Sequence, residues 1–213
     1  RTKHHTLKFR VDPPDMSTFN HATAVAWDET VCGETEEEIP HDAPESLGKE
    51  VILMHYFNAN LMHDVILGKA FTGCLHLANK TPIMWHSKKQ ATSETATYGA
   101  EFIAGRTCVK QMIDLRNTLR YLGVKVQSNS CMFGDNELMI DIASYPHSGL
   151  QKRHNILSFH HVRSIMARRH PAINHLVSKS NIADVASEHW SHNDVHSLLR
   201  PVFNHIGDAG TLC

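Results

Sequence analysis

The 213-residue sequence lacks any long uninterrupted apolar run, although 41% of its residues are hydrophobic. A helix that spans a bilayer needs about 18 or more consecutive apolar residues, and no stretch of this chain approaches that length. The first 15 residues, RTKHHTLKFRVDPPD, also lack the apolar segment of a secretory signal. We therefore expect a soluble intracellular protein, cytoplasmic or nuclear, with no membrane partner.

Paired cysteines are also missing. The five cysteines are odd in number and scattered, and none forms a Cys-x-x-Cys pair, so neither a disulfide framework nor a zinc ribbon is indicated. The 18 histidines are unusually many, but they do not recur at ligand spacing beside cysteine or carboxylate partners. We interpret most of them as exposed histidines without a special role.

The near-zero net charge of −1 conceals an uneven distribution. Residues 1–50 contain 11 acidic residues against 5 Lys or Arg, whereas residues 51–213 contain 11 acidic against 16 basic. The body of the chain is therefore mildly basic, as in a nucleic-acid-binding protein, although many soluble domains have a similar balance.

Composition and turn signals divide the chain into three parts. Residues 1–49 are poor in apolar periodicity and contain the acidic run ETEEE, which indicates a partly ordered connecting arm. We expect the folded domain over residues 50–205 and a tail over 206–213. Within the domain, three apolar runs of strand length, EVILMHYF, AFTGCLHLA and TPIMWHS, predict three antiparallel strands joined by two hairpins.

The period then changes from strand to helix. Apolar residues between 93 and 122 fall on one helical stripe, which Gly123 ends. SNSCMFGD predicts a fourth strand, NELMIDIAS a short helix, residues 150–170 a basic helix, INHLVSK a fifth strand, and SNIADVASEHW a final helical turn or helix. This order predicts an α/β fold with a mixed five-stranded sheet, three strands antiparallel and two parallel, and helices on both faces.

Three acidic residues lie at the ends of predicted elements, where side chains can converge. Glu101 lies early in the long helix, Asp135 ends the fourth strand, and Asp184 begins the last helical segment. The first strand ends at Asn58 instead of an acid. Four carboxylates in these places would suit two Mg²⁺ ions about 3.5–4 Å apart, as in phosphodiester hydrolysis. Each acid taken alone is better explained as a solvated surface group.

A family resemblance supports the interpretation that these acids form one cluster. TPIMWHSKKQATSETATYGAEFIAGRTCVKQMIDLRNTLRYLGV, followed by MFGDNE, PHSGLQKRHNILSFHHVR and NIADVASEHW, resembles the ribonuclease H domain that follows the reverse transcriptase in copia-type retrotransposon polyproteins. The match covers roughly residues 40–205 in unbroken order. It implies a ribonuclease H-like fold that cleaves the RNA strand of RNA–DNA hybrids with two Mg²⁺ ions, or Mn²⁺, in virus-like particles, with the reverse transcriptase as a polyprotein partner.

The resemblance also assigns the site. Glu101 of YGAEF, Asp135 of FGDN and Asp184 of NIAD match three of the four metal-binding acids, and the fourth belongs in Tyr-x-Asp-Ala. This chain has Tyr-Phe-Asn-Ala there, so an amide at Asn58 stands where an aspartate bridges both metals. Glu188 also departs from the pattern, because it stands where a lysine is expected.

The substitution at Asn58 weakens the case for catalysis. A carboxylate brings a full negative charge and can bridge two cations, whereas a carboxamide brings one neutral oxygen and an NH₂ group that a cation repels. We expect hydrolysis to be very low or absent. Asp64 is a conceivable substitute, but six extended residues span about 20 Å, so only a tight turn would return it to the site.

Binding of the hybrid is a separate expectation from cleavage. The resemblance implies a role in product release or proton transfer for His154, although a capping or surface histidine is an equal explanation. Trp85 and Trp190 are expected in the core. Two hypotheses remain: an endonuclease, or an inactive domain of the same fold that binds nucleic acid or is structural. Candidate phosphate contacts are Lys88, Lys89, Arg106, Lys152, Arg153, Arg163, Arg168 and Arg169.

Overall fold

The structure is a computed structural model, in which the placement of most of the chain is described. The described residues are 5–7, 9–10, 12–15, 39, 41–145, 148–149, 155–167, 171–200 and 202–205. Among these residues, no helix is both long and apolar enough to cross a membrane.

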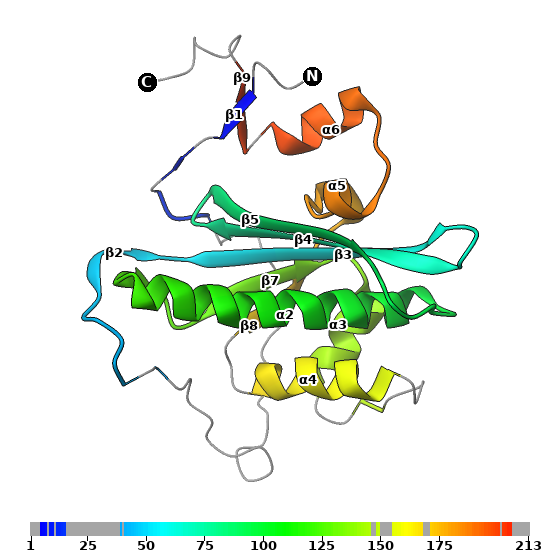
Figure 1. Ribbon diagram of the computed structural model, residues 1–213, viewed down its shortest axis with the longest axis horizontal. Coiled ribbons are helices and arrows are strands. Elements are labelled where there is room, and N and C mark those ends of the chain that lie inside the picture. The colour runs from blue at the N-terminus through cyan, green and yellow to red at the C-terminus, as the bar shows by residue number, and fades with distance from the viewer. Residues whose placement is uncertain are drawn as a thin grey trace.

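A five-stranded mixed sheet forms the centre of the fold (Figure 1). Its strands lie in the order β5 (Thr81–Lys89), β4 (Lys69–Ala78), β3 (Leu53–Asp64), β7 (Ser130–Gly134) and β8 (Pro171–His175). The three strands β3, β4 and β5 pair antiparallel, and β3, β7 and β8 pair parallel. This arrangement confirms the predicted sheet of three antiparallel and two parallel strands.

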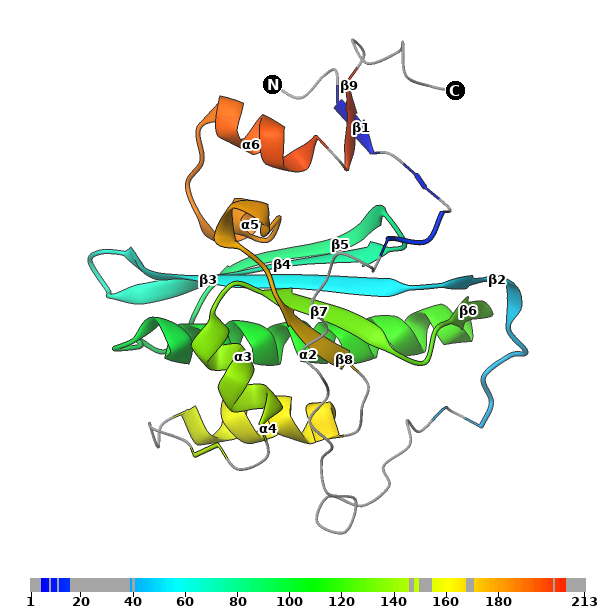
Figure 2. The same ribbon diagram turned by 180° about the vertical axis from the view of Figure 1, so that it is seen from behind.

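Helices cover both faces of the sheet, as predicted (Figures 1 and 2). The long helix α2 (Thr97–Tyr121) packs on one face, with α3 (Glu137–Ser144) and α4 (Ile156–Ala167) on the same side. The short helix α5 (Asp184–Ser187) packs on the other face against β3, β4 and β5, and α6 (His192–Leu199) follows it.

Two small strand pairs, which the sequence did not predict, lie outside the central sheet. Strand β1 (His5–Leu7) pairs antiparallel with β9 (Phe203–His205), and β2 (Leu47–Val51) pairs parallel with β6 (Val124–Val126). The run that predicted one strand from Glu50 is therefore interrupted at Ile52, between β2 and β3.

Local signals explain where the main helices end and begin. Helix α2 stops because Gly123 adopts a left-handed φ of 74°, which favours glycine. Asn136 caps the start of helix α3, because its side chain accepts a hydrogen bond from the Met139 N–H. Between α2 and the sheet, buried Phe57, Phe102 and other apolar residues form the main core.

The expectation that Trp85 lies in the core is wrong. Trp85 is 67% exposed, because it lies on β5, the outermost strand of the sheet. Trp190 is half-buried.

A buried chain of polar side chains crosses the interface between the sheet and α2. His55 and His76 are opposite each other on β3 and β4, with their Nδ1 atoms 2.7 Å apart, and His76 Nε2 lies 3.0 Å from Gln111 Oε1. Because the Gln111 oxygen can only accept, His76 Nε2 carries a proton, and its Nδ1 accepts from His55 Nδ1–H. Burial disfavours a charge on either ring, so both are neutral. Burial lowers the pKa of His55 well below its ordinary value and that of His76 to about 4.

These neutral histidines predict a loss of stability in acid. Unfolding raises the pKa of His76 from about 4 to its ordinary value of 6.5, so the unfolded chain binds more protons between these values. At pH 5 we expect His76 alone to lower the free energy of unfolding by about 2 kcal/mol relative to pH 7.5. Urea unfolding at both pH values measures this difference.

His76→Gln tests the assignment, because an amide can accept from His55 and donate to Gln111. The variant should lose that part of the pH dependence, whereas His41→Gln, at an exposed histidine, should keep it. An unchanged pH dependence in His76→Gln would contradict a neutral buried His76.

Candidate functional site

Asn58 lies in the middle strand of the sheet and faces α5. Its cross-strand neighbour on β4 is Gly73, which has no side chain to separate α5 from the sheet. A Cβ atom at position 73 would lie 2.5 Å from the Ala183 carbonyl oxygen and 2.9 Å from the Ser187 backbone nitrogen. The backbone of α5 therefore sits directly on Gly73.

The amide of Asn58 is committed to this contact with α5. Its Nδ2 donates to Ser187 Oγ at 2.9 Å, and its Oδ1 accepts from the Ala59 N–H at 2.8 Å. Ser187 Oγ in turn lies 3.3 Å from the Asp184 carbonyl oxygen, to which its hydroxyl can donate. Asn58 therefore acts as a link between β3 and α5, with its donor side turned toward the helix.

Glu101 reaches the same place from the other side of the sheet. It lies in the second turn of α2 and is buried, and its Oε1 accepts from the Ala59 N–H at 2.9 Å. That N–H is thus shared between Asn58 and Glu101, so the two predicted site residues meet at one backbone group.

Asp135 follows the end of β7 and is held by the segment after β8. Ser178 Oγ donates to Asp135 Oδ2 at 2.5 Å, and His175 Nε2 lies 3.2 Å from the Asp135 carbonyl oxygen. Ser178 begins the 3₁₀ helix η2 (Ser178–Ser180). One carboxylate oxygen of Asp135 is therefore engaged, and the residue is fixed by groups on the neighbouring strand.

Asp184 is the first residue of α5 and is buried. Its carbonyl oxygen accepts from Trp190 Nε1 at 3.1 Å, so the half-buried Trp190 fixes the start of the helix. Asp184 therefore keeps its position only while the backbone of α5 lies against Gly73.

Burial and neighbouring charges act on two of the three predicted site acids. Burial raises the pKa of Glu101 well above its ordinary value, and the charges of Asp135 and Asp184 raise it further, although the Ala59 N–H opposes this. Burial, followed by the charges of Asp135 and Glu188, raises the pKa of Asp184 to about 8. The charge of Asp135 thus disfavours ionisation of both Glu101 and Asp184, and Glu188 adds repulsion at Asp184 where a lysine would relieve it.

The fit of these residues to a divalent metal ion is mixed. Glu101 Oε2 and Asp184 Oδ1 are buried without a hydrogen-bond partner, and a cation is a natural partner for such oxygens. Yet no three His, Cys, Asp or Glu side chains in the described part of the chain are arranged as a metal site. Asn58 adds no charge, and its oxygen is already hydrogen-bonded. The donor set suits one cation better than a bridged pair.

Asp64 does not replace the missing carboxylate. Its Oδ2 pairs with Lys89 Nζ at 3.0 Å, and its Oδ1 accepts from the backbone N–H groups of Ile66 and Leu67. The hydrogen bond from Lys89 holds the pKa of Asp64 below its ordinary value. Asp64 therefore belongs to the turn between β3 and β4.

The structure separates the predicted nucleic-acid contacts into three groups. Lys88 and Lys89 on β5 and Arg106 on α2 are exposed. Arg163 is directed inward, because its Nη1 donates to the Ile142 and Ser148 carbonyl oxygens and to Ser148 Oγ, and its guanidinium lies 4.7 Å from the Phe159 ring centroid. Outside the described residues lie Lys152, Arg153, His154, Arg168 and Arg169.

Sequence reasoning missed the residues that hold the site together. Ser187 is 129 positions from Asn58, and Ser178 is 43 positions from Asp135. No spacing rule links such pairs, because the contacts exist only after the sheet has formed. The sole local signal was Ser187 itself, in the SEHW motif already assigned to the site region.

No protein-family model matches the chain. It is 26% identical over 141 residues to the retrovirus-related Pol polyprotein from transposon TNT 1-94 of Nicotiana tabacum. The alignment covers 66% of this chain but 10% of that polyprotein, so the chain spans about a tenth of its relative's length.

Solved structures of similar fold are ribonucleases H. RNase H1 from the halophilic archaeon Halobacterium salinarum NRC-1 is 13% identical, with a TM-score of 0.49 over 70% of this chain and 98% of that one. LC11-RNase H1, isolated from compost by a metagenomic approach, is 15% identical, with a TM-score of 0.50 over 70% and 98% of the two chains. The chain has a ribonuclease H-like fold. The predicted fold class is thereby confirmed.

A side chain at position 73 should disturb the site through α5. We expect Gly73→Ala to lower the free energy of unfolding by about 1–3 kcal/mol, because the added Cβ must displace backbone atoms of α5. Denaturant unfolding measures the loss. Gly149→Ala is the matched control, since a Cβ at Gly149 meets no atom of the described residues within 4 Å. Equal stability of the two variants would contradict the close contact between the α5 backbone and Gly73.

Restoring a carboxylate at position 58 should make stability depend on metal. Without divalent ions, we expect Asn58→Asp to be less stable than the native chain by about 1–3 kcal/mol, because it loses the donor to Ser187 and adds a fourth acid. Added Mg²⁺ or Mn²⁺ should recover this loss by binding the folded state. Thermal unfolding with EDTA or with each ion measures both effects.

The matched control is Asn60→Asp, two residues further along the same face of β3. Asn60 Nδ2 contacts His63 Nδ1 at 2.9 Å, within its own strand, so its replacement should leave metal dependence unchanged. If the stability of both variants depended equally on metal, the result would contradict the assignment of position 58 to the metal site.

Proposed function

We propose that this chain is the ribonuclease H-like domain of a copia-type retrotransposon polyprotein, which binds RNA–DNA hybrids but hydrolyses their RNA strand weakly or not at all. One observation carries the proposal. Burial and the charge of Asp135 raise the pKa values of Glu101 and Asp184, while the fourth position, Asn58, is an amide hydrogen-bonded to Ser187.

The residues at the site determine which parts of metal-assisted hydrolysis the chain could support. Glu101, Asp135 and Asp184 would hold Mg²⁺ or Mn²⁺, and such an ion would supply an activated water and charge stabilisation at the leaving oxygen. Orphaned oxygens on Glu101 and Asp184 support a cation there. Asn58 supports the weakness of hydrolysis, because its NH₂ group faces Ser187 and it carries no charge to balance a second ion.

Binding of the hybrid rests on other residues. Exposed Lys88, Lys89 and Arg106 are candidates for phosphate contacts, and the domain body carries an excess of basic residues. The proposed partners are an RNA–DNA hybrid and the reverse transcriptase part of the same polyprotein. A non-catalytic, hybrid-binding domain is the second candidate function, and the amide at Asn58 favours it.

Cleavage of a labelled RNA–DNA hybrid tests the proposal. In Mg²⁺ and in Mn²⁺, we expect Asn58→Asp to cut at least about 100-fold faster than the native chain, since loss of mere outer-shell partners already costs roughly 10–100-fold. Asn60→Asp should behave as the native chain. Asn58→Asp combined with Asp135→Asn should be inactive, which excludes a contaminating nuclease.

The outcomes separate the two functions. Native turnover equal to that of Asn58→Asp would overturn the proposed impairment. Hybrid binding by every variant without cleavage by any would favour the non-catalytic domain. Absence of both binding and cleavage would overturn the proposed function.

A further inference from the structure

The turn between β3 and β4 presents an exposed apolar surface. Val65 is 82% exposed, Ile66 93% and Leu67 54%, and Met62 at the end of β3 is 55% exposed. We refer to residues 62–69 as the hairpin tip. Singly exposed aliphatic residues are common, but three in succession at the end of a hairpin are typical of an interaction surface.

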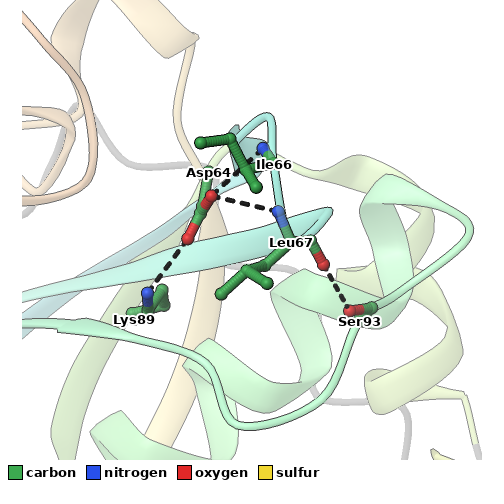
Figure 3. A network of polar contacts seen from close by, with 5 residues as sticks. All are labelled: Asp64, Ile66, Leu67, Lys89 and Ser93. Atoms are coloured by element: carbon green, nitrogen blue, oxygen red, sulfur yellow. Dashed lines mark hydrogen bonds and ion pairs between the residues drawn. The ribbon is translucent and has the colours of Figure 1, made fainter.

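The hairpin tip is held in shape by its polar neighbours (Figure 3). Asp64 Oδ1 accepts from the N–H groups of Ile66 and Leu67 at 3.2 and 3.1 Å, and Asp64 Oδ2 pairs with Lys89. Ser93 Oγ donates to the Leu67 carbonyl oxygen at 3.1 Å. The apolar side chains are therefore presented by an ordered backbone, which lowers the entropic cost of inserting them into a partner.

Basic side chains surround the base of the hairpin tip. Lys69 is opposite Asp64 in the strand pairing, Lys89 is bonded to Asp64, and exposed Lys88 precedes Lys89. Asp64 offsets one of these three charges, so the apolar tip has a net positive base. This combination complements a polyanion that also offers apolar surface between its charges.

The hairpin tip continues the strand that carries the candidate site. Asn58 pairs with Gly73 and Asp64 with Lys69, so their separation corresponds to the four-residue step between these partners on β4, roughly 14 Å. About four base pairs of a duplex cover the same length. The hairpin projects at one end of the sheet in both views (Figures 1 and 2). A duplex that is bound at the candidate site and extends along β3 can therefore contact the hairpin tip.

We propose that the hairpin tip is a minor-groove wedge for the RNA–DNA hybrid, in which Val65 and Ile66 insert at the bases while Lys69 and Lys88 contact flanking phosphates. This rests on the proposed hybrid-binding function. The minor groove is the fitting site, because in A-form helices it is wide and shallow, whereas the major groove is too deep and narrow for side chains. Aliphatic wedges in other proteins partly unstack a base step.

Binding to a fluorescein-labelled RNA–DNA hybrid in EDTA at low salt tests the wedge. We expect Val65→Ser combined with Ile66→Ser to bind about tenfold more weakly than the native chain, because two aliphatic side chains lose their burial. Ile83→Ser is the matched control, at a 37% exposed isoleucine near the opposite end of β5, and should bind as the native chain does.

Salt dependence distinguishes the apolar contact from the phosphate contacts. The double serine variant should keep the slope of log affinity against log salt, because it loses no phosphate contact, whereas Lys69→Gln should reduce that slope by about one. Ser93→Ala should weaken binding several-fold with the apolar residues and the charges intact, because it removes the hydrogen bond that holds the Leu67 carbonyl.

A hybrid with 2-aminopurine in its DNA strand reports the insertion directly. The native chain should raise 2-aminopurine fluorescence by unstacking a base step, and the double serine variant should not. Native binding with no such rise, and no affinity loss in the variant, would overturn the wedge and leave the proposed function intact. No hybrid binding by the native chain would overturn both.

Anionic vesicles test the competing occupant. Apolar and basic groups together also suit an anionic membrane surface, so the same proteins are mixed with phosphatidylserine vesicles. Vesicle binding that needs Val65 and Ile66, with hybrid binding unaffected by their replacement, would overturn the wedge.

Discussion

Repulsion between buried carboxylates is the constraint on which this site depends. Glu101 is fully enclosed between α2 and the sheet, and Asp135 and Asp184 approach it from β7 and α5. Folding encloses like charges at a cost, since burial and the charge of Asp135 raise the pKa values of Glu101 and Asp184. The amide at Asn58 lowers this cost, because it adds a hydrogen bond to α5 where a fourth acid would add repulsion.

The same arrangement explains why α5 is joined to the sheet through polar contacts. The backbone of α5 lies on Gly73, Asn58 donates to Ser187, and the exposed hydroxyl of Ser87 on β5 donates to the Ala186 carbonyl oxygen at 2.5 Å. In addition, Asn181 Nδ2 donates to the Phe57 carbonyl oxygen at 3.0 Å, just before the helix. A four-residue helix has little apolar surface of its own, so these directed bonds fix its position and that of Asp184.

The sequence allowed the sheet and the main helices to be predicted because their signals are local. Apolar runs of strand length gave β3, β4 and β5, and the helical stripe up to Gly123 gave α2. The site acids came from a family resemblance, since Glu101, Asp135 and Asp184 taken singly are ordinary charged residues. The contacts of Ser187 and Ser178 could not be predicted, because each depends on strands that pair only in the folded chain. Trp85 was misplaced because an apolar strand pattern does not reveal which strand lies outermost.

Strand β5 also has a consequence for the behaviour of the protein in concentrated solution. Its outer edge offers unpaired backbone groups, which in an open sheet are a template for another chain. Pro82 removes one backbone donor, a register irregularity opposite it interrupts the regular ladder, and Lys88 and Lys89 place charge near the other end. These features make β5 a poor template for edge-to-edge association, so the residues that suit a phosphate backbone also protect the fold against aggregation.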